Sequence, residues 1–250
     1  YGMMFRKCDN LPAIYEEEVS RIVEMGFTAS KMKIGMGVRR DEELATAVRR
    51  GAGDGFKLMA DANHAYTVGE AIQLGGTLRD LDFYWFEEPV MPEDYSGYCA
   101  VREALPGINI AGGEAEWTRF GHRELLTRRC VDILQPEVAA TGGISEFMRI
   151  LAMAHAFGTP VMPHVWGSDV LIAVDMHLVS VIPDIPGGLH QFEPMLEYDT
   201  TSNLFHEHLL TEPLGILDEV KTTGGYIRPP QGPGIGIELN DDFIRQYRVA

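Results

Sequence analysis

Short apolar runs alternate along this chain with longer segments of helical periodicity. Eight apolar runs predict strands, near residues 1–5, 30–34, 56–61, 83–86, 108–111, 131–134, 159–162 and 188–192. Seven segments between them predict helices, at 12–25, 40–50, from 68, 94–105, from 118, 144–155 and 168–181. Strands that alternate with helices indicate an α/β fold, here a TIM-like (β/α)7β barrel. An open doubly wound sheet is the alternative.

A polar residue ends each apolar run after the first, and these residues recur at nearly constant steps of 23 to 29 residues. They are Lys33, Asp61, Glu87, Glu114, Glu137, His164 and Glu193. A strand, a helix and two loops take about this length, so the period indicates a βα repeat. The strands of a parallel barrel deliver such residues to one mouth, where active sites lie. Charged ends on so many successive strands favour the closed barrel over the open sheet.

The periodicity is lost after residue 200, where proline and glycine become frequent. We therefore expect a catalytic barrel over residues 1–205 and a separate C-terminal segment over 206–250. The chain opens without methionine and directly inside an apolar run. We expect it to be the C-terminal portion of a longer protein.

Composition restricts the class of partner. The 250 residues include 21 Lys and Arg against 37 Asp and Glu, a net charge of −16. A surface this acidic disfavours nucleic acid and anionic membranes as partners. The apolar runs are also too short to span a membrane. Three widely spaced cysteines without metal-binding spacing indicate reduced thiols in a cytoplasmic protein, namely Cys8, Cys99 and Cys130.

Three carboxylates end consecutive predicted strands, at Asp61, Glu87 and Glu114. Neighbouring strands lie about 4.8 Å apart, so these side chains are expected within several Å of one another. Such charges repel unless a cation lies among them. An all-oxygen set of ligands predicts Mg²⁺; separate solvated strand ends are the structural alternative. Asn63, two residues after Asp61, can face the same site and contact a ligand.

Two lysines alternate on one predicted strand, so Lys31 and Lys33 point to the same face. Beside a metal and an anionic ligand, one can bind a substrate carboxylate and the other can act as a base. The alternative is a pair whose amines reach out to solvent.

His164 and Glu137 end the seventh and sixth predicted strands. Their positions allow a carboxylate–imidazole hydrogen bond, which orients a catalytic histidine and raises its basicity. Glu193 ends the eighth run, across the mouth from the three carboxylates, and is expected to contact the substrate.

These motifs together resemble the enolase superfamily, in its mandelate racemase/muconate lactonizing enzyme branch. The resemblance rests on an ordered set of short motifs that spans the predicted barrel: Lys31-x-Lys33, Asp61-x-Asn63, Phe86-Glu87-Glu88-Pro89, Gly113-Glu114, Gly142-Gly143, Pro163-His164 and Glu193. Longer stretches, 61–68 and 163–167, look most like the galactarolactone cycloisomerase group and related acid-sugar enzymes.

The resemblance implies removal of the proton α to a carboxylate, giving a metal-stabilised enediolate. It implies Mg²⁺ ligands at Asp61, Glu87 and Glu114, and acid/base roles for Lys33 and His164. Lys31 would neutralise the substrate carboxylate, while Asn63 and Glu193 would contact the substrate. The expected substrate is a sugar acid or its lactone, in a homo-oligomeric enzyme.

Two departures from the family pattern stand out. Position 137 holds Glu where the branch usually has Asp as the partner of the histidine. The N-terminal capping domain of the family is not in this sequence, and residues 206–250 resemble the tail that packs on it. Without the cap, we expect weak activity or none from the isolated chain.

Several functions stay open at this point. Cycloisomerisation is preferred; a dehydratase and a racemase or epimerase use the same site. A non-catalytic barrel that binds a metal or a partner would be expected to have lost a ligand or Lys33. A metal-dependent hydrolase or aldolase is disfavoured because no His-x-His pair ends a predicted strand; His206-x-His208 lies in the C-terminal segment.

Overall fold

A parallel sheet forms the centre of the molecule. The computed structural model describes residues 10–185, 192–201 and 203–248. Its sheet has the order β1-β2-β3-β4-β5, with β1 Ala29–Lys33, β2 Lys57–Asp61, β3 Phe83–Glu87, β4 Asn109–Gly112 and β5 Ile133–Leu134. A single parallel bridge joins Leu134 to Val161, where the seventh strand was predicted. The strand predicted at 1–5 and nearly all of the one at 188–192 lie outside the described residues.

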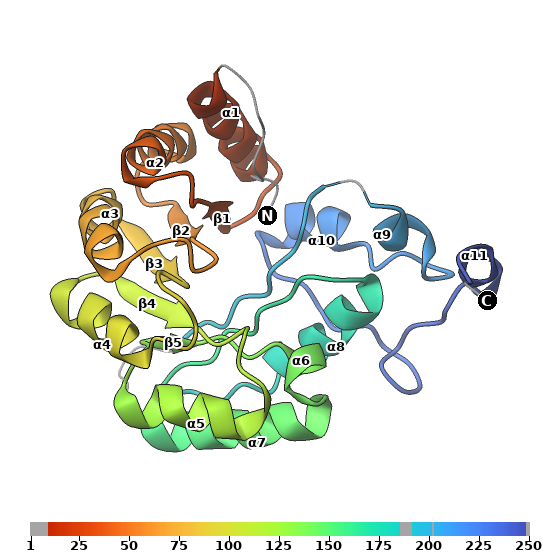
Figure 1. The fold of residues 1–250 in the computed structure, drawn as a ribbon. Coiled ribbons are helices and arrows are strands. Elements are labelled where there is room, and N and C mark those ends of the chain that lie inside the picture. The colour runs from red at the N-terminus through yellow and green to blue at the C-terminus, as the bar shows by residue number, and fades with distance from the viewer. Residues whose placement is uncertain (1–9, 186–191, 202, 249–250) are drawn as a thin grey trace.

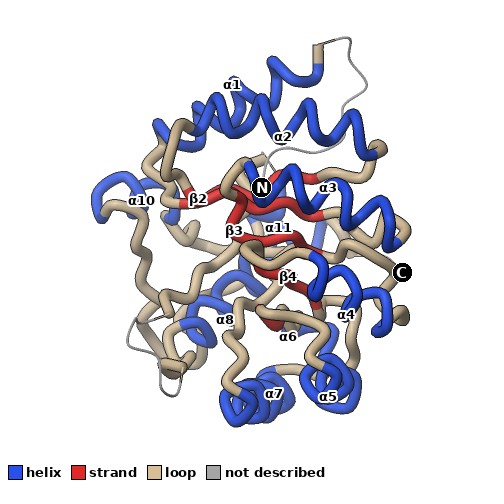
Figure 2. The backbone as a smooth tube through the Cα atoms, turned by 90° about the vertical axis from the view of Figure 1, so that its left-hand side faces the viewer, coloured by secondary structure: helices blue, strands red, loops and turns tan. Residues whose placement is uncertain are grey.

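Helices follow the strands in the predicted alternation. They are α1 Leu11–Glu24, α2 Val38–Ala52, α3 Val68–Asp80, α4 Tyr95–Ala104, α5 Thr118–Arg128, α7 Ile144–Phe157 and α8 Asp169–Val179. Figure 1 shows that α1 to α5 and α7 follow an arc on the outside of the strands. Figure 2 shows the same strands from the side, with helices on either side of them. This arrangement leaves the opposite face of the sheet turned toward the interior.

The two faces of the sheet carry different side chains. Alternate residues such as Met32, Leu58 and Phe86 belong to the large apolar cluster shared with the helices. The other face holds a smaller apolar cluster of Met59, Trp85, Ala111, Ile133 and Met162. Since side chains alternate along a strand, residues two positions from this smaller cluster point inward as well.

Register then aligns the polar strand ends. Lys33 is paired with Asp61, and Asp61 with Glu87, across β1, β2 and β3. Asp61 and Glu87 share the inward face with Met59 and Trp85, because each lies two residues further along the same strand, and Lys33 is in register with Asp61. The smaller apolar cluster therefore fills the interior toward the amino ends of the strands, and the charged groups lie at the carboxyl ends.

Some elements were not predicted. A one-turn helix, α6 Val138–Thr141, follows Glu137. The C-terminal segment contains α9 Leu204–His208, α10 Ile216–Thr223 and α11 Asp241–Gln246. Helix α10 packs against α8 through Ile216, Val220, Ile172 and Met176. The domain boundary at residue 205, and the packing of this segment on a capping domain, stay predictions. Among the described residues, no helix is both long and apolar enough to cross a membrane.

Candidate active site

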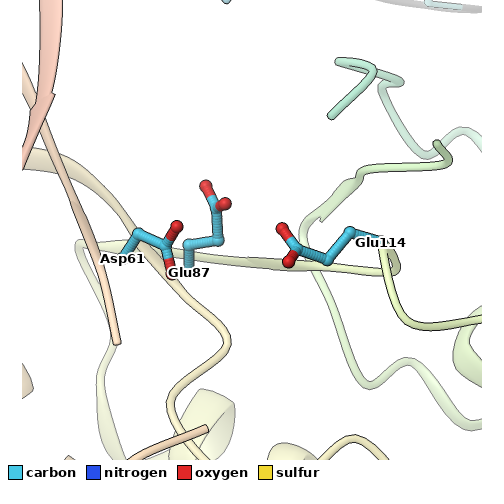
Figure 3. A group of neighbouring side chains, drawn as sticks. All are labelled: Asp61, Glu87 and Glu114. Atoms are coloured by element: carbon cyan, nitrogen blue, oxygen red, sulfur yellow. The ribbon is translucent and has the colours of Figure 1, made fainter. Parts of the chain in front are cut away.

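Three carboxylates meet above the inner apolar cluster. Asp61 and Glu87 are the last residues of β2 and β3, and Glu114 lies two residues beyond β4. One oxygen from each lies within 4.8 Å of the others. Figure 3 shows Asp61 and Glu87 side by side, with Glu114 reaching toward them. The predicted grouping of these residues is thus present in the structure.

Burial and mutual repulsion make this group unfavourable as it stands. Asp61 and Glu87 are both 0% exposed. Burial, together with the charges of Asp61, Glu197 and Glu114, raises the pKa of Glu87 well above its usual value, although Lys31 opposes this. Burial also raises the pKa of Glu114 to about 7. A divalent cation would relieve both effects, because opposite charge favours the ionised carboxylate.

The donor set fits Mg²⁺. All three ligand candidates offer oxygen, the donor type that this hard cation prefers. Oε2 of Glu114 is buried and has no hydrogen-bond partner in the described part of the chain. Nε2 of His164 lies 3.2 Å away but is not aligned for a hydrogen bond. The residues present could therefore hold the ion at Asp61, Glu87 and Glu114.

Two lysines border the carboxylates on the β1 side. Nζ of Lys31 forms ion pairs with Glu87 and Glu197 and lies 3.6 Å from Asp61 Oδ2. Nζ of Lys33 forms an ion pair with Asp61. Burial raises the pKa of Asp61, but the two lysine charges outweigh it and lower that pKa to about 2. The lysine side chains are held in place by anions rather than extending to solvent.

Asn63 lies in a tight loop after β2 and joins the same network. Its Oδ1 accepts a hydrogen bond of 2.6 Å from Lys33 Nζ. Its backbone N–H donates to Asp61 Oδ1 at 2.9 Å. Asn63 has φ 41° and His64 has φ 54°, a left-handed conformation that asparagine tolerates better than most residues. The turn fixes both the carboxylate of Asp61 and the amine of Lys33.

His164 lies on the other side of the carboxylates. Its Nδ1 is 2.9 Å from Glu137 Oε2, and its Nε2 faces Glu114. Burial lowers the pKa of His164, but the hydrogen bond with Glu137 and the charges of Glu197 and Glu114 raise it to about 9. At neutral pH the imidazole is therefore protonated and able to donate.

A fourth carboxylate, Glu197, lies beside Lys31. It comes near the end of the predicted barrel, and the sequence did not identify it. Glu197 pairs with Lys31 and accepts a 2.9 Å hydrogen bond from the backbone N–H of Val165. Glu193, the residue predicted to contact the substrate, has its Oε1 3.5 Å from the hydroxyl of Tyr226. It lines a cavity that Lys57 also lines and that contains none of the three carboxylates. The chain at 192–201 runs without strand pairing, so strand spacing does not determine which of its side chains faces the carboxylates.

Two further polar residues hold Glu87. Its Oε2 accepts hydrogen bonds from Trp85 Nε1 at 2.9 Å and from Gln135 Nε2 at 2.8 Å. Gln135 follows β5 directly, so its position after an apolar run was the signal that could have identified it. These donors leave Oε1 of Glu87 turned to Lys31.

The arrangement places the three carboxylates between two groups that can transfer protons. Lys33 belongs to β1, at one end of the strand order, and His164 lies beyond β5, at the other. A ligand held over the carboxylates would thus have an amine on one side and an imidazolium on the other. The site can bind an anion and move protons at two faces of it.

Comparison with protein families agrees with this geometry. Residues 15–243 match the family model described as "Enolase C-terminal domain-like". A D-galactarolactone cycloisomerase from Agrobacterium fabrum is 39% identical over 246 residues, which is 97% of this chain and 63% of that protein. The chain therefore spans somewhat less than two thirds of that relative.

Solved structures give the same result. The 3,6-anhydro-D-galactonate cycloisomerase from Zobellia galactanivorans matches with a TM-score of 0.81 and 34% identity, covering 95% of this chain and 63% of that one. An L-talarate/galactarate dehydratase liganded with Mg and L-glucarate matches with a TM-score of 0.76 and 28% identity, covering 92% of this chain and 52% of the other.

Proposed function

Because the chain belongs to the enolase C-terminal domain-like family, we propose that it removes the proton α to the carboxylate of a sugar acid or its lactone. The preferred overall reaction is cycloisomerisation. Family membership gives the chain a TIM-barrel-like fold, of which β1 to β5 are the described strands. Relatives described as a cycloisomerase and a dehydratase support an isomerase or lyase.

One observation carries the proposal: a buried carboxylate cluster lies between Lys33 and His164. Asp61, Glu87 and Glu114 would hold Mg²⁺. When bound, the ion would supply positive charge that acidifies the α-carbon and stabilises the negative charge developing on the substrate carboxylate. Lys31 would add a second positive charge to that pocket, since its amine already pairs with anions there.

Proton transfer would then use the two opposite groups. Lys33 Nζ would take the α-proton, and Asn63 and Asp61 orient this amine. His164, protonated at neutral pH, would donate a proton from Nε2 at the other face. Glu137 holds the imidazole through Nδ1, so Nε2 is the edge presented to the substrate. In a lactone, loss of the α-proton and departure of the ring oxygen from the β-carbon would open the ring.

The same groups serve a second candidate reaction. If the β-substituent is a hydroxyl, the same α-proton loss eliminates water, and the structural match to an L-talarate/galactarate dehydratase favours this alternative. Return of the proton to the α-carbon from the opposite side would instead give racemisation or epimerisation. A non-catalytic barrel is the least supported function, because both candidate acid/base groups and all three carboxylates are present.

The proposal extends to the rest of the protein. We propose that residues 1–205 form the catalytic barrel, that 206–250 pack partly on an N-terminal capping domain, and that the full-length protein is a cytoplasmic homo-oligomer. On this proposal residues 1–250 alone would show weak activity, because a capping domain would help to enclose the substrate. Turnover of residues 1–250 equal to that of the full-length protein would contradict this part alone.

The decisive experiment is proton NMR in D₂O with full-length protein and Mg²⁺. The panel contains hexaric, hexonic and pentonic acids and their lactones. Deuterium at the α-carbon, or a new product, that disappears with EDTA and in Glu114→Gln would support the proposal. Mg²⁺ binding without exchange across the panel would favour the non-catalytic alternative. Absence of Mg²⁺ binding would refute the assignment of the three carboxylates.

A further inference from the structure

Two of the three cysteines come together on the helix side of the sheet. Cys99 in α4 and Cys130 before β5 are 31 residues apart, yet their sulfur atoms lie 3.5 Å from each other. Each thiol also lies near a backbone carbonyl, Arg128 O at 3.4 Å from Cys99 and Tyr95 O at 3.5 Å from Cys130. Both thiols are free, and they are in contact with each other.

The two thiols differ in access. Cys99 is half-buried, whereas Cys130 is 0% exposed. Burial raises the pKa of Cys130 to about 12, and the hydrogen bond and charge of Cys99 contribute to that rise. A reagent in solvent therefore reaches Cys99 first. Once Cys99 carries an adduct, its contribution to the raised pKa of Cys130 is lost.

We propose that Cys99 and Cys130 are a modification site, a dithiol that closes to an intramolecular disulfide with a small disulfide oxidant such as oxidised glutathione. The Cys99 thiolate attacks the oxidant and releases one thiolate. The Cys130 thiol then loses its proton, and its sulfur attacks Cys99 Sγ and expels the second thiolate. The protein loses two hydrogen atoms, and the oxidant is reduced to two thiols.

The bond would join α4 to the segment that enters β5. Both cysteines pack in the apolar layer between helices and sheet, whereas Asp61 and Glu87 lie on the inward face. Cys130 also precedes β5, and Glu137 follows it. The disulfide should stabilise the fold, because a cross-link restricts the unfolded chain. It should leave the carboxylate site unchanged, because the two cysteines lie on the helix side of the sheet and the carboxylates on the inward face.

The test is non-reducing peptide mapping of the full-length protein after treatment with oxidised glutathione. Trypsin places the two cysteines in separate peptides, 80–102 and 130–149, and Cys8 in a third, 8–21. The expected product is 80–102 linked to 130–149, with a mass two hydrogen atoms below the sum. A stable glutathione adduct on Cys99 with Cys130 still free, or a link to Cys8, would overturn the proposal.

Thermal unfolding tests the consequence. The oxidised protein should melt on the order of 5–10 °C higher than the reduced protein, and dithiothreitol should reverse the gain. Cys99→Ser and Cys130→Ser should show no gain on oxidation, whereas Cys8→Ser should behave as wild type. A linked protein that melts no higher would overturn the stabilising role.

Discussion

Nδ1 of His164 lies 2.9 Å from Oε2 of Glu137, so the longer side chain at position 137 reaches the imidazole. The other oxygen of Glu137 accepts a 3.0 Å hydrogen bond from the backbone N–H of Ala139, at the start of α6. The extra methylene is therefore accommodated by binding the carboxylate to its own helix. This contact favours a working pair at the position where the family pattern has Asp.

Replacing Glu137 with Gln should lower the pKa of His164 from about 9 toward its ordinary value. The amide keeps the size of the side chain but removes the negative charge that stabilises the imidazolium. We expect the rate of product formation at about pH 8 to fall by roughly 10- to 100-fold, a part of the 10²- to 10⁴-fold effect of a general acid. His164→Asn, which removes the acid itself, should show the larger loss.

The pH profile separates this effect from a structural one. In Glu137→Gln the alkaline limb of the rate of product formation should move to lower pH, because the imidazole loses its proton earlier. NMR titration of the His164 ring measures the same shift directly. An unchanged limb with a uniformly lower rate would contradict the role assigned to Glu137.

Glu197, not Glu193, should affect the substrate site. Removing the charge in Glu197→Gln takes away an ion-pair partner of Lys31, so we expect weaker substrate binding or slower exchange by about tenfold or more. Glu193→Gln is the matched control and should keep both values within about twofold, because Glu193 faces Tyr226. Steady-state kinetics of the two variants, side by side, checks the assignment. Equal losses would show that the two residues act together.

Glu193 and Glu197 illustrate which residues of the site could be predicted from the sequence and which could not. Lys33, Asp61 and Glu87 could be placed because they end regular strands, where residue parity and register determine the face. Glu193 followed the same spacing, but residues 192–201 have no strand pairing, so parity carries no information there. The contact between Cys99 and Cys130 could not be predicted from the local sequence pattern either, because it arises from the packing of α4 beside the start of β5.

Mg²⁺ should stabilise the protein through Glu114. In EDTA, Glu114→Gln should melt a few degrees higher than wild type near pH 8, because it removes a buried carboxylate whose pKa is raised to about 7. Adding Mg²⁺ should raise the Tm of wild type, since a ligand that binds only the folded state stabilises it. The variant should show little or none of that increase.

The control is a carboxylate outside the cluster. Glu116 lies two residues after Glu114, and its carboxylate accepts a hydrogen bond from Tyr95. The variant Glu116→Gln should therefore keep the full response to Mg²⁺. Differential scanning fluorimetry across a Mg²⁺ titration measures all three proteins. A normal Mg²⁺ response in Glu114→Gln would remove this residue from the ligand set.

Asp175 should make the protein less stable as the pH rises. This residue of α8 is 0% exposed, and neither oxygen has a hydrogen-bond partner among the described residues. Burial, and then the charge of Glu137, raises its pKa from 3.8 to about 8. Because the folded-state pKa lies above the unfolded one, the stability from this group is full below about pH 4 and is lost as the pH rises to about 8.

Asp175→Asn removes this titration while keeping the shape of the side chain. Its free energy of unfolding relative to wild type should increase between about pH 5 and 8, by at most about 1.4 kcal/mol per pH unit. Urea unfolding at several pH values measures the difference, with the exposed Asp54→Asn as the control that should follow wild type. A constant difference across that range would show that Asp175 is already ionised in the folded protein at pH 5.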